Sequence, residues 1–286
     1  MVMDMTKHDR LETLPCGSLV QHGQYNDRVY LMKATDAAAA KLPKRLIGLA
    51  QNQGYGKIFA KIPLRMGKEF ETSGFLQEAR VPGFFNGSED ALFMAYYLDD
   101  LRAKESESVN YENIMKLAKA KRNSGIATAK GAGFSFRRCQ ESDVSAMAKI
   151  YQKVFASYPF PIHESDYLLE TMRDAVDYFC AEKEGVMVAL ASAEKYQQDS
   201  NWEMTDFATL PKWRGHSLGV RLLDLMENEA VRQNVKTVYT IARAASAGMN
   251  ITFARLGYHF GGRLKNNTNI SGQIESMNVW YKSPEK

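Results

Sequence analysis

Cysteine is scarce in this 286-residue chain, and the cysteines present form no recognisable pair. Cys16, Cys139 and Cys180 are widely separated and belong to no CxxC motif or cysteine–histidine cluster. This count argues against a disulfide framework and predicts no metal cofactor. Unpaired thiols are typical of a reducing compartment, so we expect a cytoplasmic protein.

Long apolar runs and dense basic runs are also missing. No stretch approaches the roughly 20 apolar residues that a membrane-spanning helix requires. The opening MVMDMTKHDRLETL has early acids and lacks the apolar segment of a signal peptide. The formal net charge is only +4, and no run of Lys and Arg is interleaved with aromatics. We therefore expect no membrane and no nucleic acid among its partners, whereas the small positive excess suits an anionic ligand.

What is present is the composition of an ordinary globular protein, with 45% hydrophobic and 24% charged residues. A chain of this length is expected to bury two cores. In the first part, alternating or β-branched stretches predict strands over 27–34, 57–63, 75–85 and 91–98. A helix closed by Gly54 and a short helix ended by Gly74 lie between them. The charged, weakly periodic stretch 102–133 predicts a connection with one exposed helix.

The second part predicts an alternation of strands and helices. A strand at FSFRRCQ is followed by two helices, a hairpin turning near Glu184-Gly185, a strand at NWEMTDFATL and a helix over 218–232. A strand, a short helix ended by Gly257 and two closing strands complete it. This order predicts an α/β layered fold, with a mixed central sheet and helices on both faces. The predicted domains are a partial α/β domain, a linker with a helix and a cofactor-binding domain, at 1–105, 106–132 and 133–286.

An internal repeat relates the two parts. FETSGF (70–75) resembles FARLGY (253–258). Continuing without a gap pairs Phe75 with Tyr258, Arg80 with Arg263, Met94 with Met277 and Tyr97 with Trp280. The first part is therefore expected to be a partial copy of the second, with chance similarity as the alternative.

The segment PKWRGHSLGV (211–220) joins a predicted strand to a predicted amphipathic helix. Free backbone N–H groups and the positive end of the helix dipole meet at such a junction. Glycines there let a diphosphate approach the backbone, and Arg214 would add charge. The alternative is that Gly215 only shapes the turn and Gly219 only permits close helix packing.

This segment resembles the acetyl-coenzyme A signature of the GNAT superfamily of N-acetyltransferases, Arg/Gln-x-x-Gly-x-Gly/Ala. Arg214 and Gly219 match its ends, whereas Ser217 stands at its first glycine and can expose its N–H if its φ stays negative. The resemblance covers about 133–282, including LGY (256–258). EMTDFATLPKWRG and RVPGFFNG look in particular like the β-lysine N-acetyltransferase family. That family has such an N-terminal extension and makes a compatible solute by acetylating the terminal amine of β-lysine.

The resemblance implies acetyl-CoA as co-substrate and a small-molecule amine as acceptor. It also implies a splayed strand whose backbone N–H groups hold pantetheine and polarise the thioester. The residues implied to contact the cofactor are Phe207, Ala208, Thr209, Arg214, Gly215, His216, Ser217, Leu218, Gly219, Val220, Ser246, Asn250 and Phe253. Ser246 replaces an expected asparagine, and Asn250 either substitutes for it or only caps the helix.

Two carboxylates are candidates for the base that deprotonates the amine, Glu203 and Asp206. Because they are three residues apart, a regular strand would send them to opposite faces, and only a bulge would bring both to the substrate. The apolar setting of Asp206 favours ammonium binding or orientation of the site. An ordinary salt bridge is the alternative for either residue.

The resemblance implies a tyrosine as the acid that protonates the leaving thiolate, but Phe253 occupies that position and has no proton to donate. Tyr239, Tyr258 and water are the alternatives. The loop FASYPFPIHESDY is implied to overhang the acceptor pocket, with Tyr158 and Phe160 as substrate-binding candidates. The alternative is a hydrophobic lid that makes no specific contact. His163 is more typical of a surface position. The candidates to clamp an acceptor carboxylate are Arg80, Arg173 and Arg243, and a solvated or structural role is the alternative for each of them.

The sequence thus predicts an N-acetyltransferase that acts on β-lysine. Two alternatives stay open: an enzyme for another small amine, a polyamine or a protein N-terminus, and a non-catalytic sensor that binds coenzyme A. The first domain is expected to pack beside the acceptor pocket or to form a subunit interface, as in a homodimer.

Overall fold

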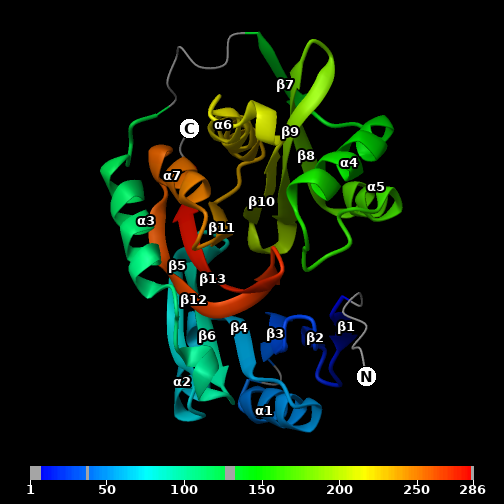
Figure 1. Ribbon diagram of the computed structural model, residues 1–286. Coiled ribbons are helices and arrows are strands. Elements are labelled where there is room, and N and C mark those ends of the chain that lie inside the picture. The colour runs from blue at the N-terminus through cyan, green and yellow to red at the C-terminus, as the bar shows by residue number, and fades with distance from the viewer. Residues whose placement is uncertain (1–7, 37–38, 126–132, 285–286) are drawn as a thin grey trace.

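The computed structural model describes residues 8–36, 39–125 and 133–284. Their strands form one 13-stranded sheet in the order β1-β2-β3-β4-β6-β5-β12-β13-β11-β10-β9-β8-β7 (Figure 1). The strands are β1 (Arg10–Thr13), β2 (Leu19–Gly23), β3 (Arg28–Lys33), β4 (Lys57–Pro63), β5 (Leu76–Phe85), β6 (Glu89–Tyr97), β7 (Phe134–Arg138), β8 (Val176–Lys183), β9 (Val186–Tyr196), β10 (Asn201–Thr209), β11 (Thr237–Arg243), β12 (His259–Ile270) and β13 (Gln273–Lys282). The α-helices are α1 (Leu42–Gln53), α2 (Gly67–Thr72), α3 (Ser108–Ala120), α4 (Val144–Val154), α5 (Ser165–Asp174), α6 (Leu218–Arg232) and α7 (Ala247–Arg255).

Two halves of the sheet repeat one topology, and we call β1–β6 the first half and β7–β13 the second half. β3 and β4 are parallel, and so are β10 and β11. Each parallel pair continues into an antiparallel pair, β6-β5 in the first half and β13-β12 in the second. The helix α1 connects β3 to β4 as α6 connects β10 to β11. The predicted mixed sheet and partial copy are therefore confirmed.

The ungapped alignment of the repeat is wrong in its last strand. In the first half Leu76 pairs with Ala95, but in the second half His259, the equivalent of Leu76, pairs with Tyr281. Ala95 therefore corresponds to Tyr281 rather than to Asn278. The extra residues lie in the β12–β13 hairpin, which is longer than the β5–β6 hairpin. The sequence similarity around Gly74 and Gly257 gives no sign of this difference in length.

The two halves join edge to edge where Ala79 of β5 pairs with Gly262 of β12. The φ of Gly262 is +144°, and a Cβ at this position would lie 2.2 Å from the carbonyl oxygen of Glu78. Glycine is required here because no side chain could be accommodated at that distance. The close approach of the two strands makes the sheet continuous.

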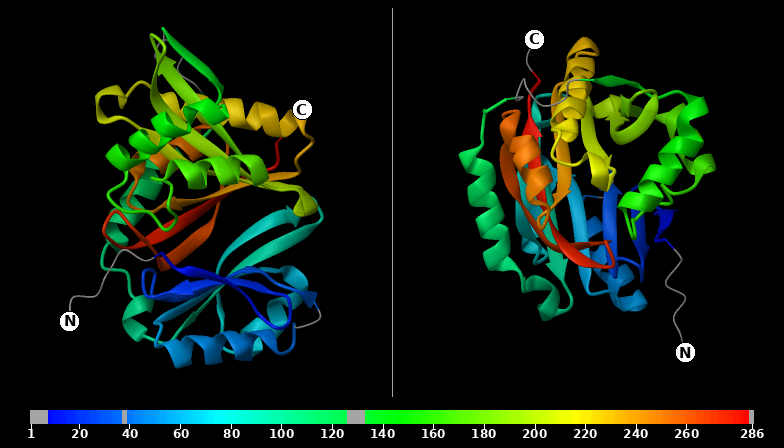
Figure 2. Two further views of the ribbon diagram at one scale, coloured as in Figure 1. Left: turned by 90° about the vertical axis from the view of Figure 1, so that its right-hand side faces the viewer. Right: turned by 45° about the horizontal axis from the view of Figure 1, so that its top comes forward.

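Different layers cover the two faces of the second half (Figure 2). On one face α6 and α7 pack around a core that includes Trp202, Leu222, Met226 and Phe253. On the other face α4 and α5 cover one end of the sheet. The first half covers the rest of that face through a shared aromatic core of Tyr30, Phe59, Phe84, Phe93 and Tyr239. The face of the second half opposite α6 and α7 is therefore covered by α4, α5 and the first half.

The helix α3 follows the first half along the chain and lies beside α7 (Figure 1). The prediction of an exposed helix here is wrong, because α3 buries Tyr111, Ile114, Met115 and Ala118. Met115 and Ala118 belong to the same core as α6 and α7. The many charged residues of this segment hid the apolar stripe. No helix of the described residues has the length and apolar character needed to cross a bilayer.

Candidate active site

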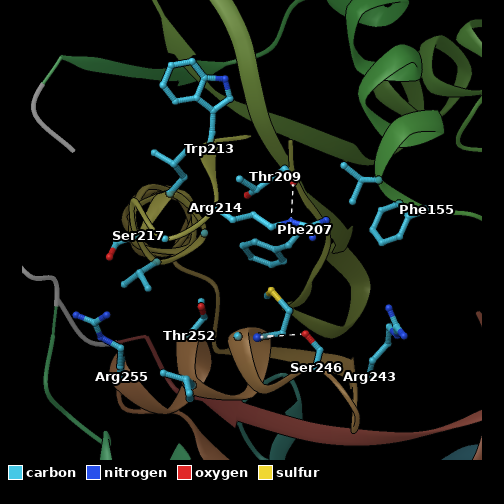
Figure 3. A pocket seen from close by; sticks show the side chains of 18 residues that line it. Phe155, Phe207, Thr209, Trp213, Arg214, Ser217, Arg243, Ser246, Thr252 and Arg255 are labelled. Atoms are coloured by element: carbon cyan, nitrogen blue, oxygen red, sulfur yellow. Dashed lines mark hydrogen bonds between the residues drawn. The ribbon is translucent and has the colours of Figure 1, made fainter. Parts of the chain in front are cut away.

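A large cavity opens where β10 and β11 separate. The two parallel strands pair only from Asn201–Thr237 to Glu203–Tyr239. Beyond that point a cavity of about 650 Å³ lies between β10, the start of α6 and the helix α7 (Figure 3). The splay leaves the rest of β10 without a ladder partner on its β11 side, so backbone groups face the cavity.

Most residues implied to hold the cofactor line this cavity: Phe207, Thr209, Arg214, Gly215, Ser217, Leu218, Gly219, Val220 and Ser246. The other four, Ala208, His216, Asn250 and Phe253, do not. The ring of His216 packs against Phe134 and Trp213, and Ala208 lies in the core under α4. Asn250 is fully buried, where it donates to the carbonyl oxygens of Arg243 and Ser246 and accepts from Trp280 Nε1. Its role here is to hold the start of α7 to the sheet.

The turn before α6 departs from the expected backbone conformation. Ser217 has a φ of +59°, although a negative φ was expected for a serine at this position. It therefore adopts the left-handed conformation that a glycine adopts readily and other residues adopt at a cost of roughly 1 kcal/mol. Gly215, at φ +84°, shares that region. The turn thus keeps the glycine-type geometry of the signature despite the serine.

The cavity fits a diphosphate-bearing cofactor. Its lining includes the N-terminal turn of α6 and the residues Arg214 and Arg255 on either side of that turn, so free N–H groups and two cations border the same cavity (Figure 3). Gly219 contributes no side chain, and a Cβ there would lie 3.9 Å from Thr252 Oγ1. A negatively charged diphosphate is therefore favoured beside this turn.

A small cavity, which we call the channel, lies between this cofactor cavity and a second cavity. The channel, about 70 Å³, shares Phe155, Phe207, Arg243 and Met249 with the cofactor cavity. Phe253, which replaces the expected tyrosine, lines the channel as well. At its other end the channel shares Tyr158, Thr205, Asp206, Ile241, Ile270 and Met277 with a cavity of about 90 Å³. We call this second space the acceptor cavity.

The acceptor cavity is built by both halves of the sheet. The second half and its loop supply Tyr158, Phe160, Glu194, Glu203 and Asp206. The first half supplies Arg28, Tyr30, Met32 and Phe59. The first half thus packs beside the acceptor cavity, one of the two positions expected for it.

A bulge in β10 brings Glu203 and Asp206 to the same cavity. The β9–β10 register shifts between Thr205 and Ala208, and Asp206 itself has a φ of +54°. A bulge adds one residue to a strand and re-aims its side chains, so residues three apart can share a face. The sequence required a bulge for both carboxylates to reach one cavity, and the structure has this bulge.

Hydroxyl groups hold both oxygens of Asp206. Ser192 Oγ donates to Oδ2 at 2.5 Å, and the Tyr158 hydroxyl donates to Oδ1. Burial raises the pKa of Asp206, and these two donors oppose the shift. The carboxylate is therefore fixed in place between the channel and the acceptor cavity.

Glu203 belongs to a chain of groups that crosses from one half to the other. The Tyr239 hydroxyl donates to Glu203 Oε2 at 2.8 Å, and Lys61 Nζ of the first half donates to the Tyr239 oxygen at 3.2 Å. Burial raises the pKa of Glu203, and the positive charge of Lys61 opposes the shift. A carboxylate with a raised pKa in a substrate cavity is suited to accept a proton.

Sequence reasoning missed Glu194, which faces Glu203 directly across the β9–β10 pair. Burial and the nearby Glu203 and Asp206 raise the pKa of Glu194. Two carboxylates directly opposite repel each other, so a cation placed between them is favoured. Its polar neighbour Tyr196 donates to Glu194 Oε2 at 3.2 Å. Glu194 lies in AEKY, an exposed-looking stretch, and gave no sequence signal.

Other sequence candidates lie outside the acceptor cavity. Arg80 and Arg173 sit at the surface in ion pairs with Asp90 and Glu141. Arg243 lines the channel but is held by Glu275, at 2.7 and 2.9 Å. Tyr258 and His163 line neither the channel nor the two cavities.

Comparison with known proteins identifies the family. The model described as "Acetyltransferase (GNAT) family" matches residues 145–258. A β-lysine N(6)-acetyltransferase of Methanococcus maripaludis is 35% identical over 270 residues, covering 94% of this chain and 97% of its own length. The chain belongs to the β-lysine N(6)-acetyltransferase family of GNAT proteins. It is an acetyl-CoA-dependent N-acetyltransferase, as its sequence predicted.

Further relatives extend the match beyond the GNAT segment. A β-lysine N(6)-acetyltransferase of Methanosarcina mazei is 33% identical, covering 82% of this chain and 94% of its own. An N-acetyltransferase, YodP of Bacillus subtilis, is 29% identical and covers 93% of this chain and 95% of its own. The similarity therefore includes the first half, which lies outside the GNAT match.

Proposed function

We propose that this enzyme transfers an acetyl group from acetyl-CoA to the terminal N6 amine of β-lysine. The observation that carries the proposal is the row of adjoining cavities: the cofactor cavity, the channel and a cavity lined by Glu194, Glu203 and Asp206. An acidic, partly buried cavity favours a cationic acceptor such as an ammonium. The relatives named for β-lysine match the first half as well, and that half lines the acceptor cavity.

Glu203 is the base in this proposal. Hydroxyl donors hold both oxygens of Asp206, whereas Glu203 accepts from one hydroxyl, that of Tyr239. Burial raises the pKa of Glu203, which suits a group that removes a proton from an ammonium. Asp206 instead orients the site and attracts the ammonium to the mouth of the channel.

The protons of the reaction balance without a tyrosine acid. Bound acetyl-CoA supplies an activated acetyl group, whose C–S bond breaks as the C–N bond to the amine forms. The ammonium nitrogen loses two protons in all. Glu203 takes the first and releases it to solvent, and the second ends on the sulfur of the departing thiol. Phe253 is therefore compatible with turnover, because the amine itself provides the proton that the sulfur gains.

Thiol release measures this activity directly. Purified enzyme is mixed with acetyl-CoA and β-lysine, free thiol is followed over time, and the position of the acetyl group is determined by mass spectrometry. We expect thiol release that depends on β-lysine and a single product acetylated at N6. Faster turnover of spermidine or of a peptide N-terminus would favour a different acceptor. Binding heat for acetyl-CoA without turnover of any amine would favour a sensor.

A further inference from the structure

One buried cation of the first half faces the acceptor cavity. Arg28 is the first residue of β3, is 4% exposed and lines the acceptor cavity. Its guanidinium lies over the rings of Tyr30 and Phe59, 5.2 and 5.8 Å from their centroids. The cation is therefore held on an aromatic platform inside the protein, where an uncompensated charge is costly.

Within the part of the chain that the structure describes, Arg28 has polar contacts but no carboxylate at salt-bridge distance; the anion whose charge acts on it, Asp9, is held by the Tyr25 and Asn26 backbone and the Asn26 amide. Its Nη1 donates to the carbonyl oxygen of Asn267 and, at 3.1 Å, to Thr268 Oγ1. Its Nε is buried without any hydrogen-bond partner. Burial lowers the pKa of Arg28 to about 10, so it stays charged at neutral pH.

Two neighbouring buried cations, Arg102 and Lys57, are each paired with a carboxylate. Arg102 is paired with Asp27 at 2.5 Å, and Lys57 with Glu78 at 2.9 Å. Buried charges are normally paired in this way, because an unpaired one loses its hydration without compensation. Arg28 departs from that rule at the wall of a substrate cavity, where an anion of the substrate can provide the missing partner.

The polar groups of the acceptor cavity are divided by position. Asp206 lines both the channel and the acceptor cavity, whereas Glu203, Glu194 and Arg28 line the acceptor cavity and not the channel; Glu203 is the nearer of the two glutamates to Asp206 along the chain. An acceptor whose amine lies at the channel therefore extends its remaining groups into the acceptor cavity. At that inner end a cation is favoured by Glu194 and an anion by Arg28.

We propose that Arg28 binds the carboxylate of the acceptor, so that the first half of the sheet selects an amino acid over a simple amine. This inference rests on the proposed function and deepens it. A diamino acid then lies with its terminal amine at Asp206 and Glu203 and its carboxylate on the guanidinium of Arg28. The second ammonium of the acceptor meets Glu194, and the same cavity discriminates against diamines that lack a carboxylate.

Acceptors that differ only at the carboxylate test this inference. β-Lysine, its carboxamide and 1,4-diaminopentane, which is β-lysine without the carboxyl group, are compared at saturating acetyl-CoA. For the wild-type enzyme we expect kcat/KM to fall roughly 10- to 100-fold for both analogues, since a charge-assisted pair is lost in each. This comparison needs no variant, so equal kcat/KM for the three acceptors would overturn the inference even if substitution of Arg28 prevented folding.

Variants assign the discrimination to Arg28. Arg28→Gln should raise KM for β-lysine roughly 10- to 100-fold, and Arg28→Lys should raise it less, because an ammonium keeps the charge but loses the planar fork. Neither variant should change kcat/KM for 1,4-diaminopentane by more than about threefold. KM for acetyl-CoA and the melting temperature report whether the fold is intact. Arg80→Gln, which removes a surface arginine paired with Asp90, is the matched control and should change none of these values.

The outcomes separate this inference from the proposed function. Equal loss of activity towards β-lysine and 1,4-diaminopentane in Arg28→Gln would mean a structural role and would overturn the inference alone. Wild-type preference for 1,4-diaminopentane over β-lysine would overturn both. A preference for β-lysine over 1,4-diaminopentane that is the same in the wild type and in both Arg28 variants would overturn the role of Arg28. The proposed function would then stand, with the carboxylate bound by another residue.

Discussion

The two halves of this protein share one topology but differ in what they place at the ends of their parallel strands. In the second half, β10 leads into a glycine-bearing turn that opens on a cavity of about 650 Å³. In the first half, β3 leads to α1 through ATDAAAAK (34–41), which has no glycine, and the ends of β3 and β4 border a cavity lined by Lys33, Lys61, Arg65 and Lys195. Diverging parallel strands thus create an opening in either half, and the loop that follows decides what the opening can hold.

The halves also differ at equivalent positions within the strands. Tyr30 of β3 corresponds to Glu203 of β10, and Phe59 of β4 to Tyr239 of β11, because each pair occupies the same place in its parallel ladder. In the second half these positions carry a carboxylate and its hydroxyl donor. In the first half they carry two stacked rings, 4.7 Å between centroids. In the first half, these two positions therefore form part of the wall of the acceptor cavity.

The largest effect is expected from substitutions at the equivalent positions Glu203 and Tyr30. Glu203→Gln should lower kcat by roughly 10²- to 10⁴-fold, because it removes the base without changing side-chain size. Tyr30→Phe should change kcat by no more than about threefold. Steady-state kinetics with β-lysine and acetyl-CoA checks both. A Glu203→Gln enzyme within about fivefold of wild-type kcat would contradict the assigned base.

Glycines in the equivalent helices α6 and α1 provide the second test. Gly219→Glu should raise KM for acetyl-CoA roughly 10- to 100-fold, because it places a carboxylate where a diphosphate is expected. Gly48→Glu in α1 is the matched control, since a Cβ there meets no atom within 4 Å and lies far from the cofactor cavity. An unchanged KM for acetyl-CoA in Gly219→Glu would rule out the turn before α6 as the anion site.

A smaller effect concerns the pH dependence that the first half imposes on the second. Glu203 acts as a base when deprotonated, so kcat/KM should rise with pH through its raised pKa. Lys61→Met removes a cation that lowers this pKa, and the rising limb should move to higher pH by roughly one unit. Lys33→Met is the control, because Lys33 is an exposed lysine that lines the cavity at the ends of β3 and β4 together with Lys61. This substitution should leave the rising limb in place. A limb that does not move, or moves to lower pH, would show that Lys61 does not act on the base.

The smallest expected effect is on stability at two left-handed positions, one in each half. Ser217→Gly should stabilise the fold by about 0.5 kcal/mol, because glycine adopts φ +59° without strain. Gly54→Ser, at φ +70° after α1, should destabilise it by about 1 kcal/mol for the opposite reason. Denaturant unfolding measures both. Opposite signs of the two changes are the predicted pattern, and equal signs would refute it.

Local patterns predicted the elements of this fold well, because their causes are local. The helix over 218–232 has those bounds in the structure, and the helix before Gly54 ends there in a left-handed C-cap. The repeat and the splayed-strand fold followed from similarly short segments. The alignment of the repeat failed where the β12–β13 hairpin is longer, a feature that no local motif marks.

The parts of the site that sequence reasoning missed depend on contacts between distant residues. The bulge at Asp206 appears only in the pairing of β9 with β10. Arg28 reaches the acceptor cavity by packing against the β12–β13 hairpin, more than two hundred positions along the chain. One signal was available: Arg28 directly precedes the apolar run VYLM of its strand, and an arginine is rarely buried in such a place without a partner.

A structure of the enzyme with coenzyme A and β-lysine tests the shared site most directly. We expect the diphosphate at the turn before α6, the N6 amine between Glu203 and the channel, and the carboxylate of β-lysine on Arg28. β-Lysine bound without any contact to residues of the first half would contradict the claim that both halves build the acceptor site.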